Sequence, residues 1–158
     1  FYYIRAHPHP QATPYKVPHK PAIVLDTNVV LDWLVFRNPQ CAPIAQAIET
    51  GQIRWLVTDA LRDELAHVLG RGVVSAWAPD EIALWERWHT LSEMAPVGGL
   101  SDAALRLRCT DADDQKFIDL ALAQAQWLIS RDRAVLKLAR RALVLGVRIV
   151  PPAKFLVP

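Results

Sequence analysis

The sequence has little cysteine or glycine and no long hydrophobic run. Its 158 residues include six glycines and two cysteines, Cys41 and Cys109. Two cysteines so far apart, after an N-terminus too short for a secretion signal, do not form the disulfide framework of a secreted domain. No apolar stretch approaches the roughly 18–20 residues of a membrane-spanning helix. We therefore expect a cytoplasmic protein with no membrane partner.

Strong charge of either sign is absent as well. The formal net charge is +2, which permits a nucleic-acid partner without arguing for one. Hydrophobic residues make up 52% of the chain and the mean hydropathy is +0.11, so a disordered chain is excluded. The length suits one domain with a substantial core.

Proline and histidine gather at the N-terminus. Residues 1–20 include the run His7-Pro8-His9-Pro10 and further prolines, which predicts an extended arm. Its histidines have ligand chemistry, but a solvated arm is the better interpretation. Residues 21–158 are then expected to form one domain.

Short apolar runs alternate with helical patterns through the rest of the chain. Strands are expected at 22–25, 54–58, 127–130 and 147–150. Helices are expected at 27–34, 41–49, 60–69, 79–91, 113–125 and 133–141, with Asp59 capping the third and Ile82, Trp85, Trp88 and Leu91 forming the apolar face of the fourth. The alternation at 105–108 predicts a further short strand. This order predicts an α/β fold, a three-layer α/β/α sandwich around a central parallel sheet.

Two acids follow expected strands directly. Asp26 ends the run Ala22–Leu25, and Asp132 comes two residues after the strand that ends at Ser130. In open α/β sheets, ligands bind at the carboxyl ends of the strands. Asp132 also suits the N-cap of the next helix, which is a structural alternative to a functional role.

Two further acids lie on expected helices. Glu64 falls at the edge of the apolar arc of its helix, whereas Asp63 faces the other side. Asp114 heads the inward stripe of the helix at 113–125. The alternatives are an ordinary surface acid for Glu64 and, for Asp113 or Asp114, an acid favoured by the helix dipole.

These carboxylates would repel one another unless a cation neutralised them. Hard oxygen ligands suit Mg²⁺ or Mn²⁺, and no histidine or cysteine occurs here at zinc-like spacing. The acids therefore predict a magnesium or manganese site.

The same residues resemble the PIN-domain family, most closely the toxin components of toxin–antitoxin systems of the VapC kind. The similarity spans about 22–152, and it is carried by four motifs: Val24-Leu25-Asp26-Thr27-Asn28-Val29-Val30, Asp63-Glu64-Leu65, Asp111-Ala112-Asp113-Asp114-Gln115-Lys116-Phe117 and Leu128-Ile129-Ser130-Arg131-Asp132. By this resemblance, an acidic tetrad is formed by Asp26, Glu64, Asp114 and Asp132. Asn28 and Ser130 would support it, and Asp113 is the alternative to Asp114.

The resemblance implies a Mg²⁺- or Mn²⁺-dependent endoribonuclease, a small antitoxin partner and a homodimer. Arg131, Arg133 and Lys137 are candidate contacts to the RNA backbone, with a solvated helix face as the alternative. The tryptophans Trp77, Trp85 and Trp88 suit either an antitoxin helix or the core and a dimer interface. A non-cleaving module of the same fold that binds RNA or protein is the main rival. A phosphohydrolase that uses Asp26 as nucleophile ranks below both, because Asn28 stands where such enzymes have a second acid.

Overall fold

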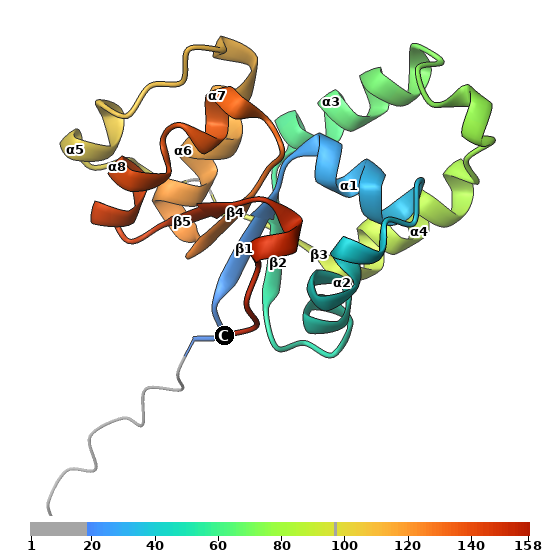
Figure 1. The fold of residues 1–158 in the computed structure, drawn as a ribbon, viewed down its shortest axis with the longest axis horizontal. Coiled ribbons are helices and arrows are strands. Elements are labelled where there is room, and N and C mark those ends of the chain that lie inside the picture. The colour runs from blue at the N-terminus through green and yellow to red at the C-terminus, as the bar shows by residue number, and fades with distance from the viewer. Residues whose placement is uncertain (1–18, 97) are drawn as a thin grey trace, which may run out of the picture.

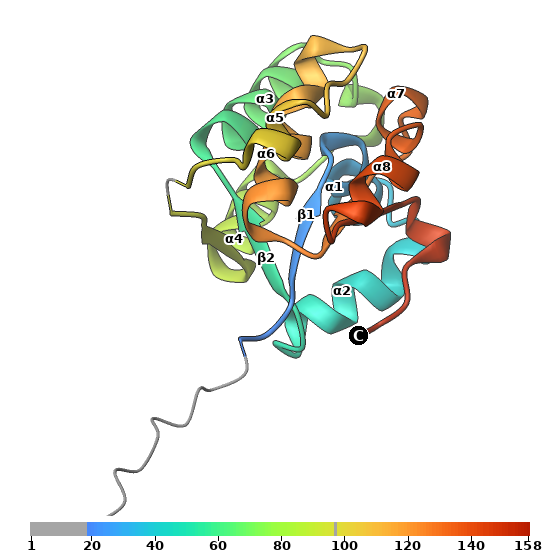
Figure 2. The same cartoon turned by 90° about the vertical axis from the view of Figure 1, so that its left-hand side faces the viewer.

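A five-stranded parallel sheet forms the centre of the molecule (Figures 1 and 2). The computed structural model describes residues 19–96 and 98–158, so nearly all of the arm expected at 1–20 lies outside the described residues. The strand order is β3-β2-β1-β4-β5, and the bounds are β1 Ala22–Leu25, β2 Arg54–Val57, β3 Ser92–Met94, β4 Trp127–Ile129 and β5 Arg148–Val150. Four of the five strands lie where the sequence predicts them.

The central strands are held by apolar burial on both faces. Every side chain of β1 and β4 is buried, and so are the last three of β2. Ile23 pairs with Trp55 on one side and with Trp127 on the other. A strand covered on both faces in this way is typical of a parallel sheet, where helices occupy both sides.

Helices enclose the sheet. Figure 1 shows α1 to α4 gathered on one side of the strands and α5 to α8 on the other. Their bounds are α1 Thr27–Leu34, α2 Ala42–Glu49, α3 Asp59–Gly70, α4 Glu81–Leu91, α5 Asp102–Leu105, α6 Gln115–Gln124, α7 Arg133–Leu136 and α8 Ala139–Val144. Single 3-10 turns occur at Pro39–Cys41, Ser75–Trp77, Ala112–Asp114 and Pro152–Lys154. The α/β/α sandwich predicted from the sequence is confirmed.

Three local predictions are wrong. The expected strand at 105–108 begins inside α5, which Ser101 caps by accepting a hydrogen bond from the amide of Ala104. The expected helix at 133–141 is two short helices, α7 and α8. Thr58, not Asp59, caps α3, because its hydroxyl accepts the amide of Leu61. In each case a cap or a turn sets the end of a helix, and the hydrophobic pattern alone does not indicate that position.

The fourth helix also differs in detail. Asp80 caps α4, and Pro79 lies just outside it. Ile82, which was expected on the apolar face, is 76% exposed, while Leu84 and Trp88 are buried. Of the three tryptophans for which the sequence left a core or an interface role open, Trp88 packs against Trp55 in the core and Trp85 packs against Trp88, whereas Trp77 is exposed. Within the described residues, no helix is both long and apolar enough to span a membrane.

Candidate active site

The candidate site lies where the direction of the strand order reverses. The chain runs from β1 outward to β2 and β3, then crosses to β4 on the other side of β1. Ligands of open α/β folds bind outside the carboxyl ends of the strands at such a switch point. Asp26 follows β1, and Ser130 and Asp132 follow β4, so both loops open at this point.

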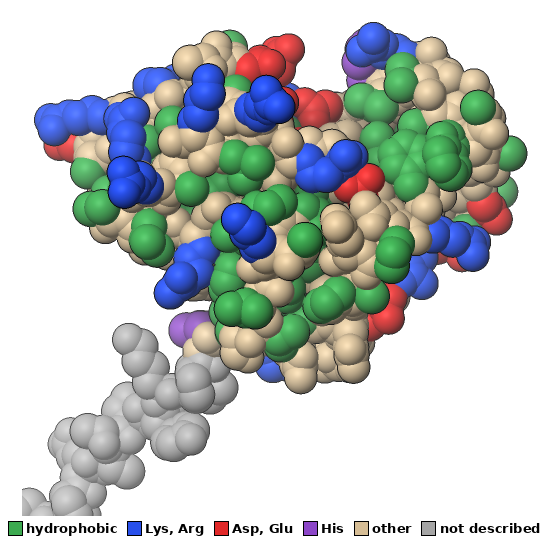
Figure 3. Space-filling view, viewed as in Figure 1, with side chains coloured by type: hydrophobic (Ala, Val, Ile, Leu, Met, Phe, Trp, Pro, Cys, Tyr) green, Lys and Arg blue, Asp and Glu red, His purple; other side chains and the backbone are tan. Residues whose placement is uncertain are grey.

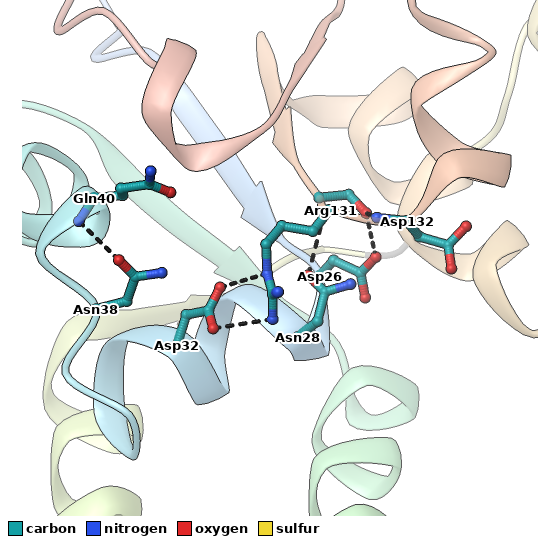
Figure 4. Close-up of polar contacts among 8 residues, drawn as sticks. Asp26, Asn28, Asp32, Asn38, Gln40, Arg131 and Asp132 are labelled. Atoms are coloured by element: carbon teal, nitrogen blue, oxygen red, sulfur yellow. Dashed lines mark hydrogen bonds and ion pairs between the residues drawn. The ribbon is translucent and has the colours of Figure 1, made fainter.

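Asp26 is buried, and residues at the end of the neighbouring strand β4 hold it in place. Its amide donates to Ile129 O at 2.9 Å, which continues the sheet pairing by one residue. Ser130 Oγ donates to Asp26 Oδ2 at 2.6 Å, and the amide of Asp132 donates to Ser130 Oγ at 3.0 Å. Figure 4 shows Asp26 and Asp132 side by side at the ends of β1 and β4. Ser130 Oγ therefore bridges the carboxylate of Asp26 and the backbone amide of Asp132.

Asp132 has two roles in this geometry. Its Oδ1 accepts a hydrogen bond from the amide of Ala134 at 2.7 Å, so it caps α7 as the structural alternative proposed. The cap fixes the carboxylate at the strand end beside Ser130. Capping and membership of the acidic group are therefore compatible.

Glu64 reaches the group from α3. One carboxylate oxygen accepts a hydrogen bond from Thr27 Oγ1, at the start of α1. The other lies 2.6 Å from Lys116 Nζ, in the first turn of α6. Lys116 Nζ also donates to Asp113 O at 2.8 Å. Glu64 is thus held between α1 and α6 by a hydroxyl and an ammonium group.

Asp114 presents an oxygen with no partner. It lies at the end of the 3-10 turn that leads into α6, and its Oδ2 is buried without a hydrogen bond. Burial raises the pKa of Asp114 to about 7, and the charges of Asp26, Asp132, Asp111 and Glu64 add to the rise. An unsatisfied buried carboxylate oxygen is costly. A bound cation or a proton would remove the cost of burying Asp114 Oδ2 without a partner.

The pKa of Asp26 is also raised, to about 6. Burial is the largest cause; the hydrogen bond from Ser130 opposes it, and the charges of Glu64 and Asp132 add to it. Asp26 and Asp114 therefore each interact with Glu64 and Asp132. The structure brings together the four acids that the sequence singled out.

The donor set fits a hard divalent cation. All four side chains offer carboxylate oxygens, and the unpartnered oxygen of Asp114 supplies an open ligand position. As they stand, no three Asp, Glu, His or Cys side chains in the described part of the chain are close enough to enclose an ion. In this arrangement Glu64 is paired with Lys116, and one oxygen of Asp132 accepts the amide of Ala134. Cation binding here requires these side chains to shift.

The expected supporting residues occupy different places. Asn28 Oδ1 accepts the amide of Arg131 at 3.3 Å, which ties the loop after β4 to α1. Asp113 is exposed, and its amide donates to Asp111 Oδ1 at 3.0 Å. Of the two adjacent acids, Asp114 is the one whose pKa is raised by the charge of Asp26.

The candidate RNA contacts lie beside the acids. Arg131 pairs with the buried carboxylate of Asp32, with Nε 2.6 Å from Oδ2 and Nη2 3.0 Å from Oδ1 (Figure 4). Its guanidinium is therefore engaged within the chain. Arg133 and Lys137 are exposed on and after α7. Figure 3 shows acidic side chains in the notch between α7 and α3, with Lys and Arg side chains beside them over α7 and α8.

Sequence reasoning missed several residues that shape the site. Thr27 and Lys116 hold Glu64, Asp111 adds to the negative charge around Asp114, and Asp32 holds Arg131. Thr27, Asp111 and Lys116 occur within the motifs described above, so their positions gave a signal. The partners of Thr27 and Asp32 lie 37 and 99 residues away in the sequence, and no local pattern indicates them.

Comparison with known proteins yields one match. A family model described as a PIN domain matches residues 22–134, which include all four acids. No curated protein and no solved structure matches the chain. The match covers the sheet through β4 and both loops that carry the site.

Proposed function

Since the chain belongs to the PIN-domain family and has its nuclease-type fold, we propose that it is an endoribonuclease that requires Mg²⁺ or Mn²⁺. The observation that supports this most is the buried, unpartnered Oδ2 of Asp114 beside three further carboxylates at the switch point of the sheet. Without a cation, these four carboxylates are a poor binding site for a phosphate, because like charges repel. A bound cation removes that conflict.

The proposed roles follow from the contacts. Asp26, Asp114 and Asp132 would hold the cation, and Glu64 would join them or orient a water. The bound cation would lower the pKa of a water molecule and neutralise the charge of the phosphate. Hydrolysis then adds one water across a P–O bond and leaves a phosphate monoester and a hydroxyl group.

The surrounding residues position these groups. Ser130 Oγ–H fixes Asp26 Oδ2 and favours its charged form. Thr27 and Lys116 hold the Glu64 carboxylate in the metal-free protein. Arg133 and Lys137 would meet the RNA backbone at the rim, where phosphate contacts set the register of the strand.

The test is cleavage of RNA by the purified chain with Mg²⁺ or Mn²⁺ and with EDTA. We expect cleavage that EDTA abolishes and that Asp26→Asn or Asp114→Asn lowers by at least about 100-fold. Asp63→Asn is the matched control, because Asp63 adjoins Glu64 in α3 but is exposed. Cleavage that persists in EDTA or in Asp26→Asn would refute the proposal.

One observation favours the rival, a non-cleaving module that binds RNA or protein. Glu64 already has a hydroxyl and an ammonium partner, so its negative charge is neutralised without any metal. The two proposals differ in one result. RNA binding without cleavage at any metal concentration would favour the module.

The toxin role is a finer part of the same proposal. It rests on the resemblance described above, and the exposed side chains of Val73, Trp77 and Ile82 offer an apolar surface for an antitoxin or a second copy. We expect expression of the chain to arrest growth, and a small protein encoded beside it to co-purify and restore growth. Light scattering of the purified chain tests the homodimer. Growth arrest that Asp26→Asn retains would contradict the toxin role.

A further inference from the structure

A groove of about 630 Å³ opens beside the acidic group, between α3 and α6 at the carboxyl ends of β2 and β3. Figure 2 shows α3 and α6 close together on one side of the molecule. Apolar side chains line most of it, among them Met94, Ala95, Leu100 and Leu120. The sequence analysis assigned nothing to this groove.

The groove and the acidic group share one residue. Lys116 lines the groove and at the same time lies 2.6 Å from Glu64. The groove therefore borders the acidic group, with Lys116 at the boundary between them. A phosphodiester at the acids would leave the adjacent nucleotide at the mouth of the groove.

The charges on the walls decide which part of a nucleotide fits. Asp59 and Asp119 line the groove, and both disfavour a second phosphate there. An uncharged base is compatible with them, since its amino groups can donate to a carboxylate and its faces can lie on apolar side chains. The volume lies within the range of small-molecule sites.

We propose that this groove binds the base of the nucleotide next to the cleaved phosphodiester. The inference rests on the proposed RNA substrate and adds a subsite that selects among nucleotides. The backbone phosphate stays at the boundary near Lys116, and the base enters the space between α3 and α6.

The experiment is a double-mutant cycle between one wall residue and one base. Ala60 lines the groove from α3, and Ala66 is exposed on the same helix outside it. Ala60→Leu fills the groove, Ala66→Leu is the matched control, and leucine suits a helix nearly as well as alanine. Affinity for a short fluorescent RNA oligomer, and for versions that each lack one base, is measured by anisotropy in an Asp26→Asn background.

We expect loss of one base to weaken binding to the Asp26→Asn protein roughly tenfold, because the apolar faces of that base would no longer be buried in the groove. The same loss should have almost no effect once Ala60→Leu is added, whereas Ala66→Leu should retain the full effect. Equal effects in the two leucine variants, or no effect of removing any base, would overturn the inference.

A separate measurement distinguishes failure of the nuclease proposal from failure of the groove assignment. The intact oligomer is incubated with the unaltered chain and Mn²⁺. If the oligomer is not cut but the binding cycle shows the coupling, the groove assignment stands and the nuclease proposal falls. If it is cut and the coupling is absent, the groove assignment falls alone.

Discussion

Ser130 and Asp26 meet across the switch point of the sheet, with Ser130 Oγ 2.6 Å from Asp26 Oδ2. Ser130 is fully buried, and the same oxygen accepts the amide of Asp132. One hydroxyl therefore aligns the acid that follows β1 with the acid that follows β4.

Ser130→Ala should impair the site without breaking the fold. The hydrogen bond from Ser130 lowers the pKa of Asp26, so its loss should raise that pKa further above about 6. Loss of an outer-shell partner typically costs about 10- to 100-fold in metal affinity or activity. The measurement is the pH profile of cleavage, whose acidic limb should move to higher pH. Ser75→Ala, at an exposed serine, should keep the original profile. An unmoved limb in Ser130→Ala would argue against this role.

Lys116→Met should strengthen cation binding. The ammonium group neutralises Glu64 in the metal-free protein and competes with any ion for that carboxylate. Its removal leaves a more negative site, and we expect Mn²⁺ affinity to rise by about two- to tenfold. Calorimetric titration measures the affinity. Lys154→Met, at an exposed lysine on the last 3-10 turn, is the control for a general change of charge. Weaker Mn²⁺ binding in Lys116→Met would show that the lysine supports the site in another way.

The metal-free protein should lose stability as the pH rises from about 4 to 7. Asp26 and Asp114 have pKa values of about 6 and about 7 in the fold, whereas an unfolded aspartate ionises near about 3.9. Below pH about 4 both states are protonated, and their contribution to the free energy of unfolding is fully present. It is lost as the folded-state groups are forced to ionise, and for Asp26 the loss is at most about 3 kcal/mol.

Denaturant unfolding in EDTA at pH 5 and pH 7.5 measures this effect. Asp114→Asn should have a smaller loss of stability between the two values than the unaltered chain, and Asp63→Asn should match the unaltered chain. Mn²⁺ at pH 7.5 should restore the lost stability, because it binds the folded state alone. Identical pH dependence in Asp114→Asn and the unaltered chain would contradict the raised pKa.

Arg131→Met should destabilise the fold. The carboxylate of Asp32 is buried, burial raises its pKa, and the charge of Arg131 opposes that rise. Removal of the arginine leaves an unpaired buried acid, which we expect to cost about 1–3 kcal/mol, because Arg131 itself is partly exposed. Thermal unfolding measures the loss. The double variant with Asp32→Asn should recover part of it, and Arg140→Met, at an exposed arginine, should have little effect. Additive losses in the double variant would show that the pair is not coupled.

The sequence predicts the central architecture because burial leaves a direct pattern. Ala22–Leu25 and Trp127–Ile129 are unbroken apolar runs, and an acid follows each of them at the carboxyl end of the strand. Edge strand β3 leaves no such pattern, since Ser92, Glu93 and Met94 are at best half-buried and pair on one side only. The sequence pattern does not indicate the break between α7 and α8 either, because the helical spacing of apolar residues continues through it.

The acids could be located from the sequence, but their partners could not. A helical projection places Glu64 at the rim of the core, yet it does not show that Lys116 reaches it from another helix. Likewise, Asp114 is distinguished from Asp113 by alignment with the inward stripe, whereas its unpartnered oxygen follows only from packing. Contacts between distant segments depend on the sheet order, which periodicity does not encode.

We propose that Asp26, Glu64, Asp114 and Asp132 together bind a divalent cation. Titration with Mn²⁺, followed by the electron paramagnetic resonance signal of the free ion, tests it without any RNA. We expect saturable binding by the unaltered chain and by Asp63→Asn, with at least about tenfold weaker binding in Asp26→Asn and Asp114→Asn. Equal Mn²⁺ binding by all four proteins, or none by the unaltered chain, would contradict it.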